Sequence, residues 1–297
     1  MRQIAVIFLL GLVACQPISK DPIDYVNPFI GTGGHGHTYP GAAHPFGMMQ
    51  LSPDSRLEGW DGCGGYHYSD SIIYGFSHTH LSGTGVSDYA DVLLMPTTGD
   101  ILLNNGADSE QGYRSSFSHE KEIAEAGYYK VHLNDHRVDV ELTVSERSGF
   151  HKYIFPKGEN AQVVLDLQHR DQVLQAELEV IDSVTIRGYR YSNAWASEQR
   201  VHFFMRLSSP IVTSIFNEDS LVAGLSFGEL EKPLKIKVGI SAVDIYGAQQ
   251  NLDHEIPHWD FEKTKRKTQK TWSKALSKIK VKGRSEEKKT THKLIKK

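Results

Sequence analysis

The chain has 297 residues, of which 39% are hydrophobic and 23% are charged. This composition predicts a globular body with a substantial core. The formal net charge of -3 and the lack of a nucleic-acid-binding motif exclude a protein built to bind nucleic acid, although residues 262–297 carry 15 Lys and Arg against three Asp and Glu. An acidic body is therefore followed by a basic tail.

The N-terminus has the features of a secretory signal. The apolar run over residues 4–12 is too short to span a bilayer comfortably. The following "LVAC" matches the bacterial lipobox, which predicts cleavage before Cys15 and lipidation of its thiol. We expect a lipoprotein signal peptide over 1–14, a short leader over 15–27, and a lipid anchor in the bacterial cell envelope, on the periplasmic or outer-membrane surface. An ordinary signal peptide with an incidental Cys15 is the alternative.

Residues 27 to about 99 are dense in Gly, His, Pro, Ser and Tyr, which predicts long ordered loops joined by short strands. They contain two His-x-His pairs, His35/His37 and His78/His80. In an extended segment each pair can present two imidazoles to one point, where a third nitrogen or the Cys63 sulfur would complete a zinc-like shell. Structural histidines and histidines lining a polar pocket are the alternatives. Because no CxxC or HExxH motif is present, we assign no metal ligand from the sequence.

The segment "GWDGCGG" has the chemistry of a sugar-contact loop. The apolar face of a sugar ring stacks on an indole such as Trp60, and a carboxylate such as Asp61 accepts hydrogen bonds from hydroxyl groups. Glycines allow backbone amides to approach the ligand. The alternative is a core tryptophan on a turn. Cys63 has no disulfide partner if Cys15 is lipidated, since only two cysteines exist.

From Tyr128 onward the sequence is a succession of short segments rich in β-branched and aromatic residues. In "VDVELTV" apolar residues alternate with polar ones, and turn residues separate one segment from the next. This pattern predicts a mainly β protein, an antiparallel β-sandwich with long Gly/His-rich loops, over 28–257. The segments are "YYKVHL", "VDVELTV", "HKYIF", "AQVVLDL", "SVTIRGYRY", "VHFFMRLSS", "LVAGLSF" and "LKIKVGISAV".

At His258 the period changes from two residues to that of a helix. Phe261, Trp272, Leu276 and Ile279 can share one face opposite a Lys-rich face. We expect a basic helical linker over 258–297 that lies on the sandwich. A membrane-surface helix is the alternative.

Three stretches together resemble the N-terminal part of the glycoside hydrolase family 92 enzymes, which are exo-acting α-mannosidases. They are "DYVNPFIGTGGHGHTYPGAAHPFGMMQLSPDSR", "GWDGCGGYHYSDSIIYGFSHTHLSGTG" and "DVLLMPTTGD". The resemblance implies an N-terminal β-sandwich, a helical linker and an α/α toroid. It also implies that the catalytic acid and base, and the ligands of a calcium ion, lie in the toroid, so we expect no catalytic residue and no calcium ligand in this chain.

The resemblance further implies that the loops face a mannose-containing glycan. The residues that fall in such loops are Gly33, Gly34, Trp60, Asp61, Cys63 and His80. We expect a substrate-facing domain that cannot catalyse by itself and that lacks its partner, the toroid. One alternative is a free-standing carbohydrate-binding module. Another is an independent, metal-assisted hydrolase that uses loop histidines and the carboxylates Asp54, Glu58, Asp61, Asp88 and Asp91.

Overall fold

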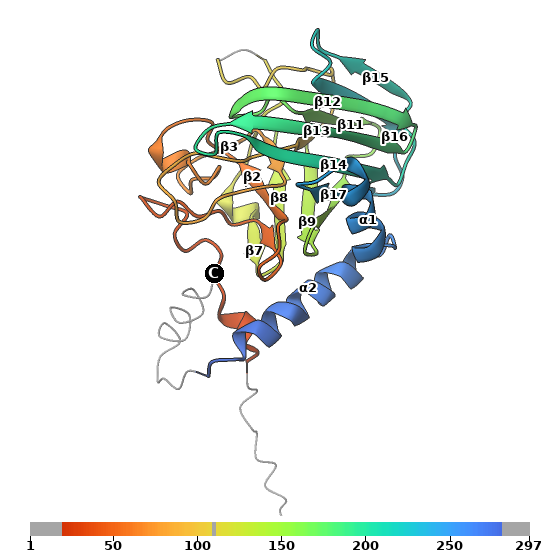
Figure 1. Ribbon diagram of the computed structural model, residues 1–297. Coiled ribbons are helices and arrows are strands. Elements are labelled where there is room, and N and C mark those ends of the chain that lie inside the picture. Colours follow the sequence, from red (N-terminus) through yellow and green to blue (C-terminus); the bar gives the residue numbers. More distant parts are fainter. Residues whose placement is uncertain (1–19, 109–110, 281–297) are drawn as a thin grey trace, which may run out of the picture.

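Two antiparallel β-sheets pack face to face in the computed structural model, which describes residues 20–108 and 111–280 (Figure 1). The first sheet has seven strands in the order β1-β2-β4-β5-β11-β16-β15, and the second has eight in the order β12-β13-β14-β17-β10-β9-β8-β7. A two-stranded sheet of β3 and β6 lies among the loops. The predicted antiparallel sandwich is therefore confirmed.

The elements have the following bounds. The seven-stranded sheet consists of β1 Ala42–Ala43, β2 Gln50–Asp54, β4 Gly75–Ser77, β5 Leu93–Thr97, β11 Asn160–Asp166, β15 Thr213–Phe216 and β16 Val222–Glu229. The eight-stranded sheet consists of β7 Ile123–Glu125, β8 Tyr128–Leu133, β9 Val138–Val144, β10 Ser148–Ile154, β12 Gln172–Asp182, β13 Thr185–Asn193, β14 Gln199–Leu207 and β17 Leu234–Ser241. The remaining elements are β3 Ile72–Ile73, β6 Ser115–Ser116, the 3-10 turns η1 Pro22–Tyr25, η2 Trp60–Gly62 and η3 His119–Lys121, and the helices α1 Ile245–Glu255 and α2 Phe261–Leu276.

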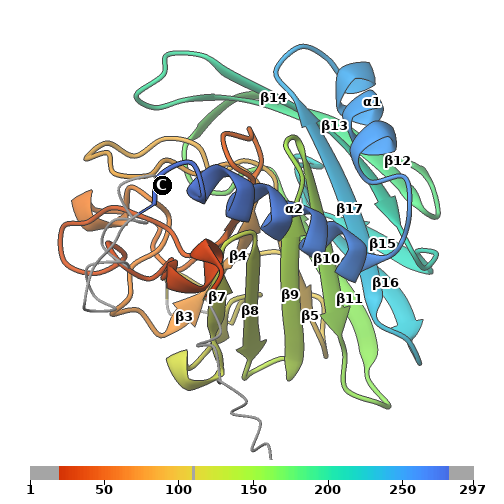
Figure 2. The same cartoon turned by 90° about the horizontal axis from the view of Figure 1, so that it is seen from below.

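Strand β9 shows how the hydrophobic pattern builds the core. Its four apolar side chains are fully buried between the sheets, as the alternation predicts: Val138, Val140, Leu142 and Val144. The opposite face is also buried at Glu141 and Thr143. Glu141 is held by the Tyr128 hydroxyl and the Lys152 ammonium, at 2.8 and 2.9 Å. Both faces of β9 are covered because α2 crosses the outer face of its sheet (Figure 2).

Of the strands that follow Tyr128, β12 and β15 were not predicted from the sequence. Each lies at an edge of its sheet and is exposed along much of its length. In β12, charged and amide side chains interrupt the apolar residues, as in "QAELEVID". An edge strand of this kind buries little surface, so its sequence carries little hydrophobic signal.

The two helices pack on the outer face of the eight-stranded sheet. Helix α1 falls inside the segment expected to be sandwich, and its buried residues Ala248 and Leu252 lie against β17. Helix α2 confirms the predicted apolar face at Phe261, Trp272 and Leu276. Ile279 is half-exposed and lies beyond the end of the helix.

The N-terminal 3-10 turn η1 packs against the C-terminal helix. Ile23 and Val26 contact the cluster formed by Trp272 and Leu276, and the Ser273 hydroxyl donates to the Asp21 carboxylate at 2.5 Å. Among the described residues no helix is both long and apolar enough to span a membrane. Cys15 and residues 281–297 of the basic tail lie outside the described residues.

Candidate functional site

A tight loop over residues 31–38 carries His35 and His37. The loop folds back on itself at Gly36, where a Cβ atom would lie 2.1 Å from the Gly31 carbonyl oxygen. Only glycine fits such an approach of backbone to backbone. His37 adopts a positive φ of 53°, which a residue other than glycine rarely adopts. The backbone therefore turns sharply between the two histidines.

Both rings converge on Asp61. Its Oδ1 atom lies 2.6 Å from Nδ1 of His35 and 3.4 Å from Nε2 of His37. The hydrogen bond from His35 lowers the pKa of the Asp61 carboxyl. Trp60 contacts both rings, with centroid distances of 5.0 Å to His35 and 4.4 Å to His37, yet its indole remains 57% exposed. The structure thus brings the predicted sugar-contact pair next to the first His-x-His pair.

Cys63 supports this surface from behind. Its buried thiol donates a hydrogen bond to the Thr84 carbonyl at 2.8 Å, and burial raises the pKa of the thiol. Gly85, which follows Thr84 in the chain, lies against the indole of Trp60. A Cβ atom at Gly85 would be 2.7 Å from Nε1 of Trp60. Cys63 therefore fixes the neighbouring loop, and its sulfur is not joined to the two histidines. Gly33 and Gly34 are exposed in the loop before His35.

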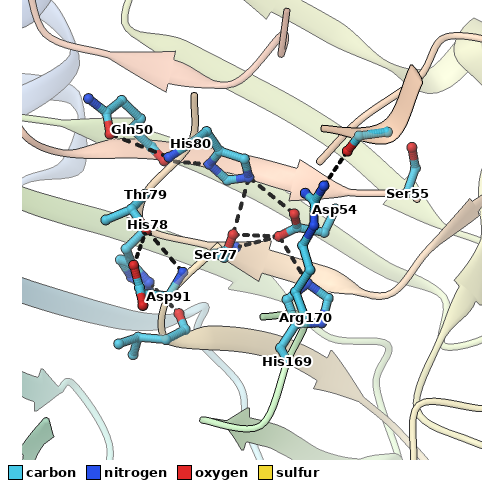
Figure 3. Close-up of polar contacts among 12 residues, drawn as sticks. Gln50, Asp54, Ser55, Ser77, His78, Thr79, His80, Asp91, His169 and Arg170 are labelled. Carbon is cyan, nitrogen blue, oxygen red and sulfur yellow. Dashed lines mark hydrogen bonds and ion pairs between the residues drawn. The ribbon is translucent and has the colours of Figure 1, made fainter. Parts of the chain in front are cut away.

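His80 belongs to a buried polar network rather than to the open surface (Figure 3). Its Nδ1 atom faces the Gln50 carbonyl oxygen at 2.8 Å, and its Nε2 atom faces the Asp54 carboxylate at 3.2 Å. Ser77 donates a 2.5 Å hydrogen bond to the same carboxylate. Burial tends to raise the pKa of Asp54, but His80 and His169 outweigh it, so the pKa is held well below its usual range. Asp54 is an internal anion that ties β2 to β4.

The second His-x-His pair does not converge on one point. Nε2 of His78 lies 2.9 Å from Nε2 of His151 on β10, and Nδ1 faces the Val92 carbonyl oxygen at 2.5 Å. His80 points to a different set of partners. Burial lowers the pKa of His78 to about 4. Side chains at positions i and i+2 share a face only in a regular extended strand. His78 and His80 come after β4 has ended at Ser77.

Two of the remaining candidate carboxylates are committed to structural bonds. Asp91 is fully buried and pairs with Arg190 at 2.6 Å, while Thr79 donates to its other oxygen at 2.6 Å. Asp88 is buried and accepts the Ala196 amide at 2.9 Å. Glu58 lies exposed in the loop before Trp60. Of the five carboxylates named from the sequence, only Glu58 and Asp61 therefore reach solvent near Trp60.

A cavity of about 460 Å³ opens where the β13–β14 hairpin meets the loops. Its lining contains none of the residues predicted to contact sugar, and sequence reasoning named none of the residues that line it. They are Met48, Gln50, Thr79, Tyr89, Ala196, Gln199, Arg200, Val201 and Ala242. Arg190 was also missed, although it shares the inward face of β13 with the buried Ile186. A charged residue at an inward position of an alternating strand is a signal that could have revealed it.

Comparison with known proteins identifies the family. Residues 25–241 match the glycosyl hydrolase family 92 N-terminal domain. The chain belongs to glycosyl hydrolase family 92. Residues 247–292 match the family 92 catalytic domain, a range that includes α2 and most of α1.

Solved family 92 structures share this fold. The family 92 α-mannosidase of Bacteroides thetaiotaomicron is 34% identical and superposes with a TM-score of 0.83, covering 92% of this chain and 40% of its own. Its structure has also been determined in complex with mannoimidazole. A family 92 inverting mannosidase of the same organism is 25% identical, with a TM-score of 0.80, and covers 93% of this chain and 39% of its own.

A curated relative carries the description of a secreted glycosidase. An uncharacterized secreted glycosidase of Arthroderma benhamiae is 27% identical over 313 residues, which cover 92% of this chain and 40% of the relative. The family 92 chain described here thus spans about 40% of the length of the relatives it matches.

Proposed function

We propose that this chain is the sugar-facing sandwich of an α-mannosidase and that Trp60 and Asp61 form part of its mannose-binding wall. The observation that carries the proposal is the exposed indole of Trp60 next to a carboxylate held in place by His35. An indole face stacks on the apolar face of a pyranose, and the carboxylate accepts hydrogen bonds from its hydroxyls. Gly33 and Gly34 are exposed in the same loop as His35. The complex of a related α-mannosidase with mannoimidazole supports the choice of mannose.

In this proposal the sandwich binds and orients the sugar, while the bond-breaking carboxyl groups come from a toroid. Inverting hydrolysis needs an acid and a base on opposite sides of the glycosidic bond, with room for a water molecule between them. Asp54 and Asp91 are buried and bonded to protein groups, and Asp61 is engaged by two histidines. The same proposal places the calcium ion of the active enzyme in the toroid.

The test is mannoside binding and turnover by the purified chain. Saturation-transfer NMR with methyl α-mannoside should show binding with a Kd on the order of millimolar, about -4 kcal/mol. Trp60→Ala should abolish the signal, and Asp61→Asn should weaken it. Trp195→Ala is the matched control, because Trp195 is also an exposed tryptophan, at 74%, but lies on the β13–β14 hairpin. An equal loss in the control would contradict the proposal.

The same preparation should not hydrolyse 4-nitrophenyl α-mannoside, with or without calcium. Adding the toroid as a separate polypeptide should restore part of the activity, and Trp60→Ala should reduce it again. Turnover by the chain alone that disappears in Asp61→Asn would instead support an independent hydrolase.

We also propose that the protein is anchored in a bacterial envelope by acyl chains on Cys15. The support is the "LVAC" sequence that follows a short apolar run. Acyl chains hold a protein on a membrane in proportion to the methylene groups that they bury. In such a location the sugar-binding surface would meet glycans from outside the cell.

A further inference from the structure

We propose that His35, His37 and Asp61 form a binding site for one divalent transition-metal ion. Each of these three residues offers one ligand atom, and the three atoms lie within 4.8 Å of one another. Among the described residues, no other group of three or more His, Cys, Asp or Glu side chains lies close enough to hold one metal ion. Within the group, Oδ1 of Asp61 contacts Nδ1 of His35 and Nε2 of His37. In a tetrahedral zinc site with bonds of about 2 Å, neighbouring ligand atoms lie roughly 3.3 Å apart, so small side-chain rotations suffice.

The ligand set selects the metal. Two imidazole nitrogens and one carboxylate oxygen suit Zn²⁺, Co²⁺ or Ni²⁺, whereas Ca²⁺ requires six to eight oxygen ligands. Two histidines with one carboxylate also match the three-ligand pattern that leaves a fourth position open. His35 is largely exposed, so this fourth position faces solvent and can be taken by water.

The site is largely formed before any ion arrives. The close approach of Gly36 to the Gly31 carbonyl and the positive φ of His37 fix the backbone that carries both histidines. The Trp60 indole packs on both imidazoles and covers one side of the cluster. A preformed ligand set avoids the ordering cost that a flexible loop would have to meet on binding.

The metal and the sugar would share Asp61. If the proposed mannose-binding wall is correct, a bound ion occupies the carboxylate oxygen that sugar hydroxyls need and therefore weakens mannoside binding. Metal binding itself does not depend on that wall, so each can fail without the other.

The direct test is titration of the purified chain with Zn²⁺ by calorimetry, and with Co²⁺ by visible absorption. We expect one ion per chain and the d–d bands of four-coordinate Co²⁺. His35→Ala should weaken binding by at least about 100-fold, because even outer-sphere changes cost about 10- to 100-fold in metal affinity. His35 has an exposed side chain, so the variant should fold normally. Asp61→Asn should weaken binding as well.

The matched control is His132→Ala. His132 faces Asp139 at 2.8 Å on the surface, which makes it a His–Asp pair without a second histidine. This variant should bind Zn²⁺ like the unchanged chain. Affinity that is equal in the unchanged chain and in His35→Ala, or a stoichiometry that falls only in His132→Ala, would overturn the metal proposal. Loss of methyl α-mannoside binding in Trp60→Ala with Zn²⁺ affinity retained would separate the sugar site from the metal site.

Discussion

The Asp91 carboxylate and the Arg190 guanidinium form a fully buried ion pair, 2.6 Å long, that joins the two sheets of the sandwich. Asp91 precedes β5 in the seven-stranded sheet, and Arg190 lies on β13 in the eight-stranded sheet. Arg190 also donates to the carbonyl oxygens of Leu167, His169 and Asp171. The pair therefore holds the loop after β11 and the segment before β5 on one rigid support, next to the loops that carry the candidate site.

Removing one partner of this pair should be strongly destabilising. Asp91→Ala leaves a buried guanidinium without its counter-ion, and such losses cost about 3–5 kcal/mol. Urea unfolding of the variant should show that the free energy of unfolding is lower by this amount. The control is Glu179→Ala, which breaks the half-exposed pair of Glu179 with Arg187 and should cost roughly 0–1 kcal/mol. Equal effects from the two variants would contradict the structural role of Asp91.

The buried histidine His78 makes the fold sensitive to mild acid. Its pKa is lowered from 6.5 to about 4 by burial, so between these pH values the unfolded chain binds a proton that the folded chain does not. Stability should therefore fall as the pH falls from 6.5 to 4, by about 3 kcal/mol from this residue. The lowered pKa of His151 adds to the loss in the same direction.

Urea midpoints measured from pH 7 to pH 4 check this prediction. His78→Asn should be less stable at pH 7 but should show a shallower dependence on pH. Asp54 acts in a separate window: its lowered pKa contributes stability that is present above pH 3.8 and is lost as the pH falls further. If the urea midpoint depends on pH equally in His78→Asn and in the unchanged protein between pH 6.5 and 4, groups other than His78 cause the dependence.

The energetic contribution of the contact between α2 and the β7–β8 turn can be measured by comparing alanine substitutions at two glycines with similar backbone geometry. Gly127 has φ +77°, and a Cβ atom there would lie 2.5 Å from Cγ2 of Thr268 on α2. Gly158 has φ +79° with nothing within 4 Å. Gly158→Ala should cost about 1–2 kcal/mol for the left-handed backbone alone, and Gly127→Ala should cost clearly more.

Thr268→Ser tests whether the excess comes from this contact. Serine removes the methyl group but keeps the hydroxyl that donates to the Val144 carbonyl. The Gly127→Ala variant should therefore recover part of its stability in the Thr268→Ser background, and Gly158→Ala should not. If both glycine variants recover the same stability in the Thr268→Ser background, the extra cost of Gly127→Ala does not come from the contact with the Thr268 methyl group.

Lipidation at Cys15 predicts where the protein is found in cells. Labelled palmitate should enter the unchanged protein and should be absent from Cys15→Ser, which should leave the membrane fraction. Cys63→Ser serves as the control, since its thiol is buried and bonded to the Thr84 carbonyl. Absence of label from the unchanged protein would exclude the lipobox interpretation.

The interior strands from Tyr128 onward could be predicted from the sequence because each carries its own hydrophobic pattern, whereas β2 and β4, which lie in the Gly-rich and His-rich region, were not predicted individually. The bounds of β8 and β9 coincide with the segments "YYKVHL" and "VDVELTV". Their apolar residues face the core between the sheets, except Tyr128, which packs under the helices. Edge strands β12 and β15 and helix α1 bury fewer side chains, so local pattern was not enough to identify them. Helix α2 was recognised because Phe261, Trp272 and Leu276 repeat at helical spacing on one face.

The residues of the candidate site could also be identified from the sequence, where Trp60, Asp61 and the two His-x-His pairs stood out as candidates. The pairs have identical spacing but different fates, since His35 and His37 converge on Asp61 at the surface while His78 and His80 are buried against different partners. Spacing determines which side chains can share a face only when the local backbone is regular, and the loops of this protein are not.

The sequence by itself determined the sandwich and the family, because alternating hydrophobicity and long loop motifs are local properties of the chain. It also supplied the residue types of the proposed sugar contact. Only the tertiary structure decided which polar groups meet: Asp91 with Arg190 across the two sheets, and His35 with Asp61, 26 residues apart. These contacts depend on how sheets and loops pack against one another, and that packing is set by the burial of the whole core rather than by any one segment.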